Sequence, residues 1–205
     1  SVNFNTTAFT GNLQSSGLWV PNVPTENSVK GTVYLFPEFA GQYKVIANNG
    51  STLNLLNLNY NIKTKTLETF VSKDSVFQYE LNQFSYVINN NRKFKVNSNG
   101  KLKGLSLEVY NSKKIQLFKY YSVFIEKAVI NPMTNVVVSD AVYTHVFSYY
   151  LYVNGKEVKI KLNKNDILNV LSDKKNEIKD FVLSNKLTYS KEEDVYKILE
   201  YYDSI

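Results

Sequence analysis

The sequence predicts a mainly β (α+β) fold, an antiparallel barrel or sandwich followed by two or three short C-terminal helices. Apolar and polar residues alternate in segments such as 58–63, the period of a half-buried strand. The 16 Tyr and 12 Phe favour pleated, half-buried surfaces. After Leu162 the apolar period becomes that of an α-helix. We therefore expect an extended N-terminal arm (1–29), an antiparallel β domain (30–162) and a C-terminal helical segment (163–205) packed on the β domain.

The N-terminal arm is expected to be extended because Pro21 and Pro24 disfavour a helix. Trp19, the only Trp, lies beside them. Two interpretations are open for this residue. Trp19 packs on the core of its own domain, or Trp19, Val20 and Pro21 form an anchor that binds a partner, since Trp is frequent at interface hot spots.

A hairpin over residues 53–70 is expected to organise the first part of the β domain. Residues 58–62 form one strand, with Leu, Tyr and Ile on one face and Asn on the other. The polar residues 63–66 interrupt the pattern, and the return strand begins at Leu67. Asn48-Asn49-Gly50, just before the hairpin, predicts a turn.

Two long strands, 115–126 and 142–153, are expected in the second part of the β domain. Residues 127–141, which contain Asn131-Pro132, are expected to form a long connection between them. Asn154-Gly155 predicts a type I′ turn after the second strand, because both residue types tolerate positive φ.

The strand that returns from this turn presents two lysines on one face. Val158 and Ile160 are expected on the other face, toward the core. Lys159 and Lys161 are candidate partner-binding residues, because a lysine-bearing face suits an acidic rim on a partner. Binding through these lysines would be weakened by salt.

The C-terminal segment shows helix-start patterns and apolar stripes. Asn163 with Asp166 is expected to cap the first helix, Ser172 the second, and Ser190 to begin a capping box for the third. The stripe of the third helix repeats at helical spacing and consists of Val195, Ile198, Leu199 and Tyr202.

Composition argues against several kinds of chemistry. The chain has no Cys and one His, His145, so we expect no metal and no cofactor. The positive charge comes almost entirely from Lys, with Arg92 the only Arg, and the net charge is +6. This composition does not suit a nucleic-acid partner.

No apolar run is long enough for a transmembrane helix, so no membrane insertion is expected. The sequence begins at Ser1 and has Met133 as its only Met, as expected of a chain whose signal peptide has been removed.

Two functional interpretations stay open for side chains that otherwise have a structural role. The aromatic and lysine side chains of residues 118–121 are typical of a carbohydrate- or other ligand-binding platform, but core packing and cross-strand pairing explain the same residues and are the favoured interpretation. A glycoside hydrolase-like carboxylate pair is the other alternative. Its candidates lie in or beside expected strands and are Glu68, Glu80, Glu108 and Glu126.

Several segments resemble one family of exported proteins. They are GTVYLFPEFAGQYKV (31–45), LNLNYNIKTKTLE (56–68), DKKNEIKDFVLSNKL (173–187) and EEDVYKILEYYDS (192–204). The resemblance is to a mostly uncharacterised β-rich family of Bacteroidota, chiefly flavobacteria, and it covers residues 30–205. Its motifs are structural rather than catalytic, and the arm before Lys30 has no counterpart in it.

The resemblance implies a setting for the chain. It implies a periplasmic protein associated with the outer membrane, with an outer-membrane protein complex as partner. We expect a non-catalytic protein–protein interaction module, an accessory or plug subunit such as that of the type 9 protein secretion translocon.

Overall fold

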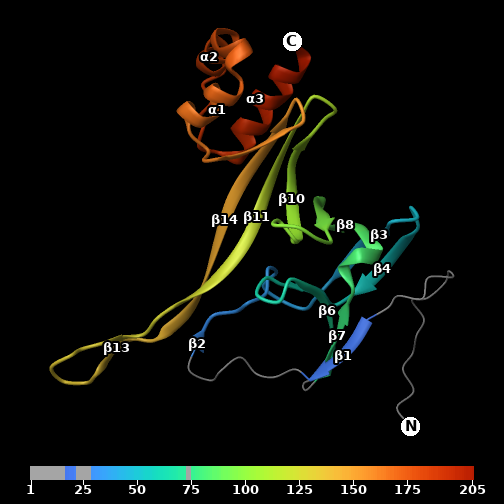
Figure 1. Ribbon diagram of the computed structural model, residues 1–205, viewed down its shortest axis with the longest axis vertical. Helices are drawn as coiled ribbons and strands as arrows, with labels where there is room; N and C mark the ends of the chain where they lie inside the picture. Colours follow the sequence, from blue (N-terminus) through green and yellow to red (C-terminus); the bar gives the residue numbers. More distant parts are fainter. Residues whose placement is uncertain (1–16, 22–28, 73–74) are drawn as a thin grey trace. The chain divides into compact units, whose positions relative to one another are not determined.

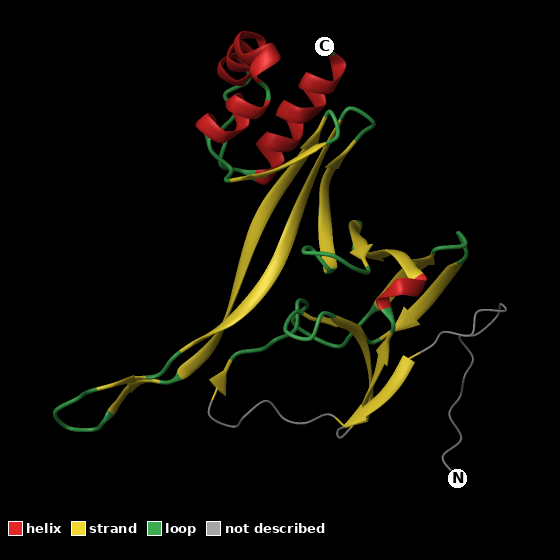
Figure 2. Cartoon of the chain, in the orientation of Figure 1, coloured by secondary structure: helices red, strands yellow, loops and turns green. Residues whose placement is uncertain are grey.

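The computed structural model describes residues 17–21, 29–72 and 75–205. The expected fold class is confirmed, because strands, nearly all antiparallel, make up 49% of the chain and three short α-helices lie near its C-terminus (Figure 2). Of the two β architectures expected, the structure is sandwich-like with open sheets and is not a closed barrel.

The chain divides into two compact units, each described separately below. The first unit contains residues 1–105 and 121–146, and the second contains 106–120 and 147–205. These units differ from the three segments expected from the sequence, because the long strands pass from one unit into the other. The expected arm 1–29 lies largely outside the described residues, which include its part Gly17–Pro21 as strand β1.

The first unit contains one complete antiparallel sheet and one end of a second, nine-stranded sheet (Figure 1). The first sheet has the order β1 (Gly17–Pro21), β7 (Ser75–Tyr79), β6 (Thr66–Ser72), β5 (Leu58–Asn61). At this end of the second sheet the strands run in the order β4 (Thr52–Leu56), β3 (Gln42–Ala47), β8 (Phe84–Asn89), β9 (Arg92–Asn97), and the sheet continues from β9. A 3₁₀ turn, η1 (Leu81–Gln83), precedes β8, and β2 (Val29–Lys30) pairs in parallel with residues 141–142.

The expected hairpin over 53–70 is present only in part. The polar break at 63–66 is the turn between β5 and β6, but residues 53–56 belong to β4 in the other sheet. The expected polar face of β5 is wrong, because Asn59 and Asn61 are buried. The Asn59 side chain binds the backbone of Phe36 through both its amide and carbonyl groups, at 3.0 and 3.1 Å. A buried Asn is tolerated here because its polar atoms are satisfied by the preceding segment.

The second unit combines the helices with the whole of one strand, β15, and with those residues of three other strands that lie within 106–120 and 147–205. The strands are β10 (Gly104–Asn111), β11 (Ile115–Glu126), β14 (Ala141–Val153) and β15 (Lys156–Ile160). The helical elements are α1 (Lys164–Val170), η2 (Ser172–Lys174), α2 (Lys175–Ser184) and α3 (Glu192–Ser204). The expected type I′ turn between β14 and β15 is confirmed, since φ is 49° at Asn154 and 72° at Gly155.

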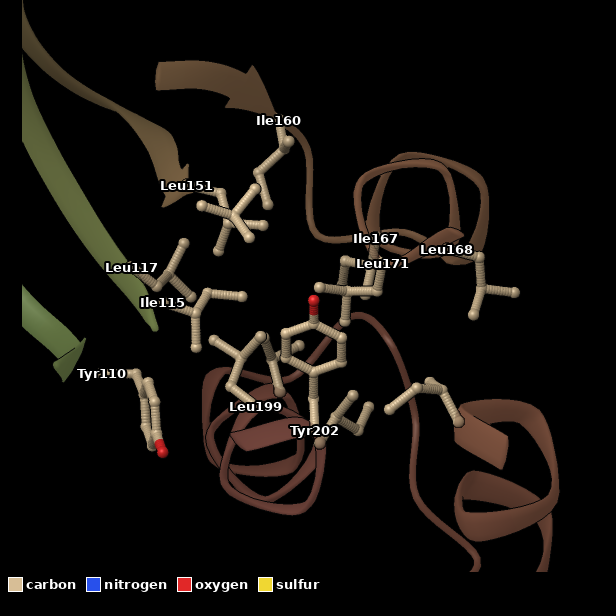
Figure 3. Packing of buried hydrophobic residues seen from close by; sticks show 14 of the residues in the cluster. Tyr110, Ile115, Leu117, Leu151, Ile160, Ile167, Leu168, Leu171, Leu199 and Tyr202 are labelled. Carbon is tan, nitrogen blue, oxygen red and sulfur yellow. The ribbon is translucent and has the colours of Figure 1, made fainter. Parts of the chain in front are cut away.

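The helices bury their apolar stripes against these strands (Figure 3). The expected stripe of α3 is confirmed, because all four of its residues are buried. They share one core with strand residues such as Ile115, Leu117 and Leu151. A short helix cannot bury its apolar face alone, so this shared core is what holds the helices in place.

The helix caps follow the sequence only at α1. The Asn163 side chain accepts a hydrogen bond from the Asp166 N–H at 2.9 Å, as expected. The expected caps at Ser172 and Ser190 are wrong, because α2 and α3 begin after Lys174 and Lys191 without a side-chain cap.

Candidate docking site

An apolar hairpin stands out in the first unit. We use this name for residues 124–142, the end of β11, the strands β12 (Val129–Ile130) and β13 (Val137–Ser139), and the start of β14. β12 and β13 pair as a separate two-stranded ribbon in which Val129 faces Ser139 and Ile130 faces Val137. Figure 1 shows this ribbon continuing β11 and β14 to a closed end.

The closed end of the apolar hairpin is held by its own polar groups. The Asn131 N–H donates to the Val136 carbonyl at 2.9 Å, and the Asn131 side chain accepts from the backbone N–H of Met133 at 2.9 Å. Asn135 adopts a φ of 53°, which Asn tolerates better than most residues. The turn is therefore satisfied without help from surrounding structure.

The side chains of the apolar hairpin are exposed on both faces. Val136, Val137 and Val138 follow one another and are 60%, 54% and 66% exposed, so neither face of the ribbon is covered. Met133 at the closed end is 93% exposed. The other exposed apolar residues of the hairpin are Phe124, Ile125, Val129, Ile130 and Val142. Contiguous exposure of this kind is typical of interaction surfaces.

Charge is confined to the base of the apolar hairpin. No charged residue occurs from Ala128 to Ser139. Asp140 forms an ion pair with Lys30 at 2.6 Å, and this contact raises the pKa of the Lys30 amine. An uncharged end suits an apolar partner surface, and binding through it is expected to respond little to salt.

The sequence-based candidates Trp19, Val20 and Pro21 lie on β1. Their strand pairs with β7, so that Trp19 is opposite Phe77. The Trp19 ring contacts Phe77 edge-on, with 5.2 Å between ring centroids, and Trp19 is still 62% exposed. Trp19 thus packs on its own sheet and also offers an open aromatic surface. The partner role of these three residues stays a prediction.

The candidates Lys159 and Lys161 lie in the second unit, on the wall of a groove of about 760 Å³. Both are exposed, and the Lys161 backbone N–H donates to Asp166 at 2.8 Å. Glu192, which also lines the groove, is bound by Lys119 at 2.5 Å and by the Tyr149 hydroxyl. The Glu192 carboxylate is therefore already paired, and the partner role of the two lysines stays a prediction.

Glu68, one of the candidate catalytic carboxylates, is buried and satisfied. It accepts hydrogen bonds from Tyr34 at 2.7 Å, Thr66 at 2.7 Å and Gln78 at 2.9 Å. Burial, and then the bond to Glu68, raise the pKa of Tyr34. A buried carboxylate with three donors joins strands together and is poorly placed to reach a substrate.

The other candidate groups also have local partners. Glu108 accepts from Asn111 at 2.8 Å and Glu126 from Thr144 at 3.3 Å. His145 lies 2.7 Å from the Thr32 carbonyl, in keeping with a locally satisfied histidine.

Within residues 17–21, 29–72 and 75–205, no cluster of three or more His, Cys, Asp or Glu residues is arranged to hold a metal. In the same part of the chain, no helix has the length and apolar character needed to span a bilayer.

Comparison of the chain with protein families, with curated proteins and with solved structures found no match. The apolar hairpin was missed by sequence reasoning, which expected residues 127–141 only to connect two strands. The indication was available in Val136-Val137-Val138, because three successive apolar residues are unusual in a solvated connection.

Proposed function

We propose that this chain is a non-catalytic protein–protein interaction module that docks through the apolar hairpin. The observation that carries the proposal is the uncharged ribbon whose apolar side chains are exposed on both faces. A partner with an apolar slot would cover both faces at once, whereas a flat partner would leave one face in water.

The energetics require the whole hairpin rather than one residue. Full burial of an aliphatic side chain contributes at most about 1.5–3 kcal/mol. Met133, Val137 and Val138 together thus supply at most roughly 5–9 kcal/mol. Because association costs about 4–15 kcal/mol, the neighbouring apolar residues must contribute to a stable complex.

A protein slot suits the ribbon better than a lipid bilayer. A two-stranded ribbon has backbone N–H and C=O groups along both outer edges. In hydrocarbon each unsatisfied group costs several kcal/mol, which offsets the gain from about one or two buried side chains. Protein groups in a slot can satisfy these edges.

The envelope setting belongs to the same proposal. We propose an accessory or plug subunit of an outer-membrane protein complex, located in the periplasm. This part is supported by the resemblance of residues 30–205 to exported proteins of Bacteroidota.

The experiment compares charged variants at matched exposed sites. Val137→Asp inserts a charge into the apolar hairpin, and Leu183→Asp does the same on α2, where Leu183 is 79% exposed. Both variants are expected to keep the wild-type melting temperature. Affinity chromatography from detergent-solubilised envelopes should lose one partner with Val137→Asp and retain it with Leu183→Asp. Retention of every partner by Val137→Asp would refute docking through the hairpin.

A further inference from the structure

We infer that the partner protein binds the apolar hairpin by adding a β-strand along the outer edge of β12. This inference rests on the proposed docking through the hairpin and names its mode. Strand addition obtains affinity from main-chain hydrogen bonds and selectivity from pockets for alternate side chains.

The hydrogen bonds of the ribbon show which backbone groups face outward. Asn131 and Val136 are joined by the bond from the Asn131 N–H to the Val136 carbonyl. Antiparallel pairs alternate between bonded and non-bonded, so the adjacent pair, Ile130 and Val137, is of the non-bonded kind. In such a pair the backbone N–H and C=O groups are directed away from the partner strand. Ile130 and Val137 therefore present them at opposite outer edges of the ribbon.

The two edges differ in regularity. Val129 pairs with Ser139, and its neighbour Ile130 pairs with Val137. Val138, between the two paired residues of β13, is therefore an extra residue with no counterpart on β12. A bulge of this kind bends the strand that contains it and interrupts regular pairing. β12 has no extra residue and is the better template for an added strand.

The apolar side chains fit the same mode of binding. Along a strand, successive side chains alternate between faces, and Val129 and Ile130 are 55% and 53% exposed. An added strand next to β12 would place its own side chains beside these two residues, one on each face. The segment from Ala128 to Ser139, which contains β12 and β13, also lacks the charged residues with which exposed edges are commonly protected.

Two other occupants are less suitable. A lipid bilayer supplies no donors or acceptors to the edge of β12. A second copy of this chain supplies an equivalent edge, but each copy carries a net charge of +6, which opposes self-association. A different protein with a free strand meets both requirements.

The test separates the backbone of Ile130 from its side chain. Ile130→Pro removes the outward N–H and shortens the side chain, whereas Ile130→Ala shortens the side chain and keeps the N–H. Val137→Pro removes the outward N–H at the opposite edge and is the matched control. The probe is the complex captured with the wild-type chain in the experiment above, and affinities are measured by biolayer interferometry. Melting temperature and circular dichroism check that each variant is folded.

The expected result is that Ile130→Pro binds about tenfold more weakly than Ile130→Ala, as for one lost hydrogen bond and an unpaired acceptor on the partner. Val137→Pro is expected to bind within about twofold of Val137→Ala. Equal binding by Ile130→Pro and Ile130→Ala would overturn strand addition and leave docking by the side chains in place. A selective loss in Val137→Pro would overturn the assignment to β12.

Two further measurements test the kind of partner. Sedimentation velocity of the wild-type chain is expected to show a monomer, and flotation with phosphatidylcholine vesicles is expected to leave it unbound. A dimer abolished by Ile130→Pro, or flotation abolished by Val137→Asp, would overturn the inference of a different protein as partner. If Val137→Asp retains every partner, the proposed function itself fails, which is distinct from a failure of strand addition alone.

Discussion

Replacing Gly104 with Ala is expected to destabilise the first unit severely. Gly104 has a φ of 123°, a region that L-residues rarely adopt. A Cβ added to Gly104 would lie much less than 3.0 Å from the Tyr60 hydroxyl oxygen. Real Cβ atoms essentially never come that close to another heavy atom. Tyr60 is 2% exposed and cannot move away without disturbing the core around it.

The magnitude follows from two contributions. Backbone strain at the positive φ costs about 1–3 kcal/mol. The Tyr60 hydroxyl is hydrogen-bonded to the backbone of Leu105, and displacing it from this buried partner costs about another 1–3 kcal/mol. With a total near 4 kcal/mol, the melting temperature is expected to fall by about 8–16 °C for a chain of this size.

Trp19 provides the assay for this change. It is the only Trp, and its strand belongs to the first unit, so its fluorescence reports unfolding of that unit separately from the second. The free energy of unfolding is obtained from urea titrations followed by this fluorescence. A fitted m-value equal to that of the wild type would show that the stability itself has changed.

Two further variants separate strain from collision. Gly100 has a φ of 80°, and a Cβ added there would meet no atom within 4 Å. Gly100→Ala therefore introduces backbone strain without a steric collision. Tyr60→Phe removes the hydroxyl and leaves the nearest ring carbon 3.3 Å from the new Cβ, so it should relieve part of the loss in Gly104→Ala. The double-mutant cycle is expected to show about 1–3 kcal/mol of coupling. Equal losses in Gly104→Ala and Gly100→Ala, with no coupling to Tyr60→Phe, would refute the reasoning.

Three other predictions concern stability. Gly155→Val should lower the free energy of unfolding by about 1–3 kcal/mol, because a β-branched residue resists a φ of 72°; an unchanged urea midpoint would count against this turn. Leu199→Ala should cost about 2–5 kcal/mol and reduce the helical dichroism first, because Leu199 is 0% exposed in the core of the second unit. Burial raises the pKa of Tyr60 from 10.0 to about 12. The unfolded chain therefore loses this proton first, and stability should decline as the pH rises from about 10 toward 12. The decline should be smaller in Tyr60→Phe when urea midpoints are compared across this range.

Local patterns predicted those elements whose chemistry is local. Asn154-Gly155 specifies its turn because the positive φ values are a property of these two residues. The stripe that includes Val195 and Leu199 specifies the buried face of α3, since a helix has one period. The strands 115–126 and 142–153 were found for the same reason, with β14 beginning one residue earlier than expected.

Competing contacts explain what the sequence did not predict. Ser190 does not cap α3, which begins after Lys191; near this end of the helix, Asp194 accepts from the backbone N–H of Thr188 at 2.8 Å and from its hydroxyl at 2.9 Å. Asn59 is buried because the segment near Phe36 lies over it, a contact between residues far apart in sequence. Val136-Val137-Val138 indicates an apolar segment, but its exposure was not predictable, since a local pattern does not show whether another layer covers a ribbon.

The location of the apolar hairpin allows docking and folding to be tested separately. Met133 and Val138 are 93% and 66% exposed, so their substitution removes little buried area and should change stability by less than about 0.5 kcal/mol. Trp19 differs, because its ring packs on Phe77 and its strand completes a sheet. A loss of binding in Trp19→Ala would therefore mix a lost contact with a disturbed β1. A loss in a hairpin variant with unchanged stability would be attributable to the docking surface itself, which makes the hairpin the more decisive place to begin.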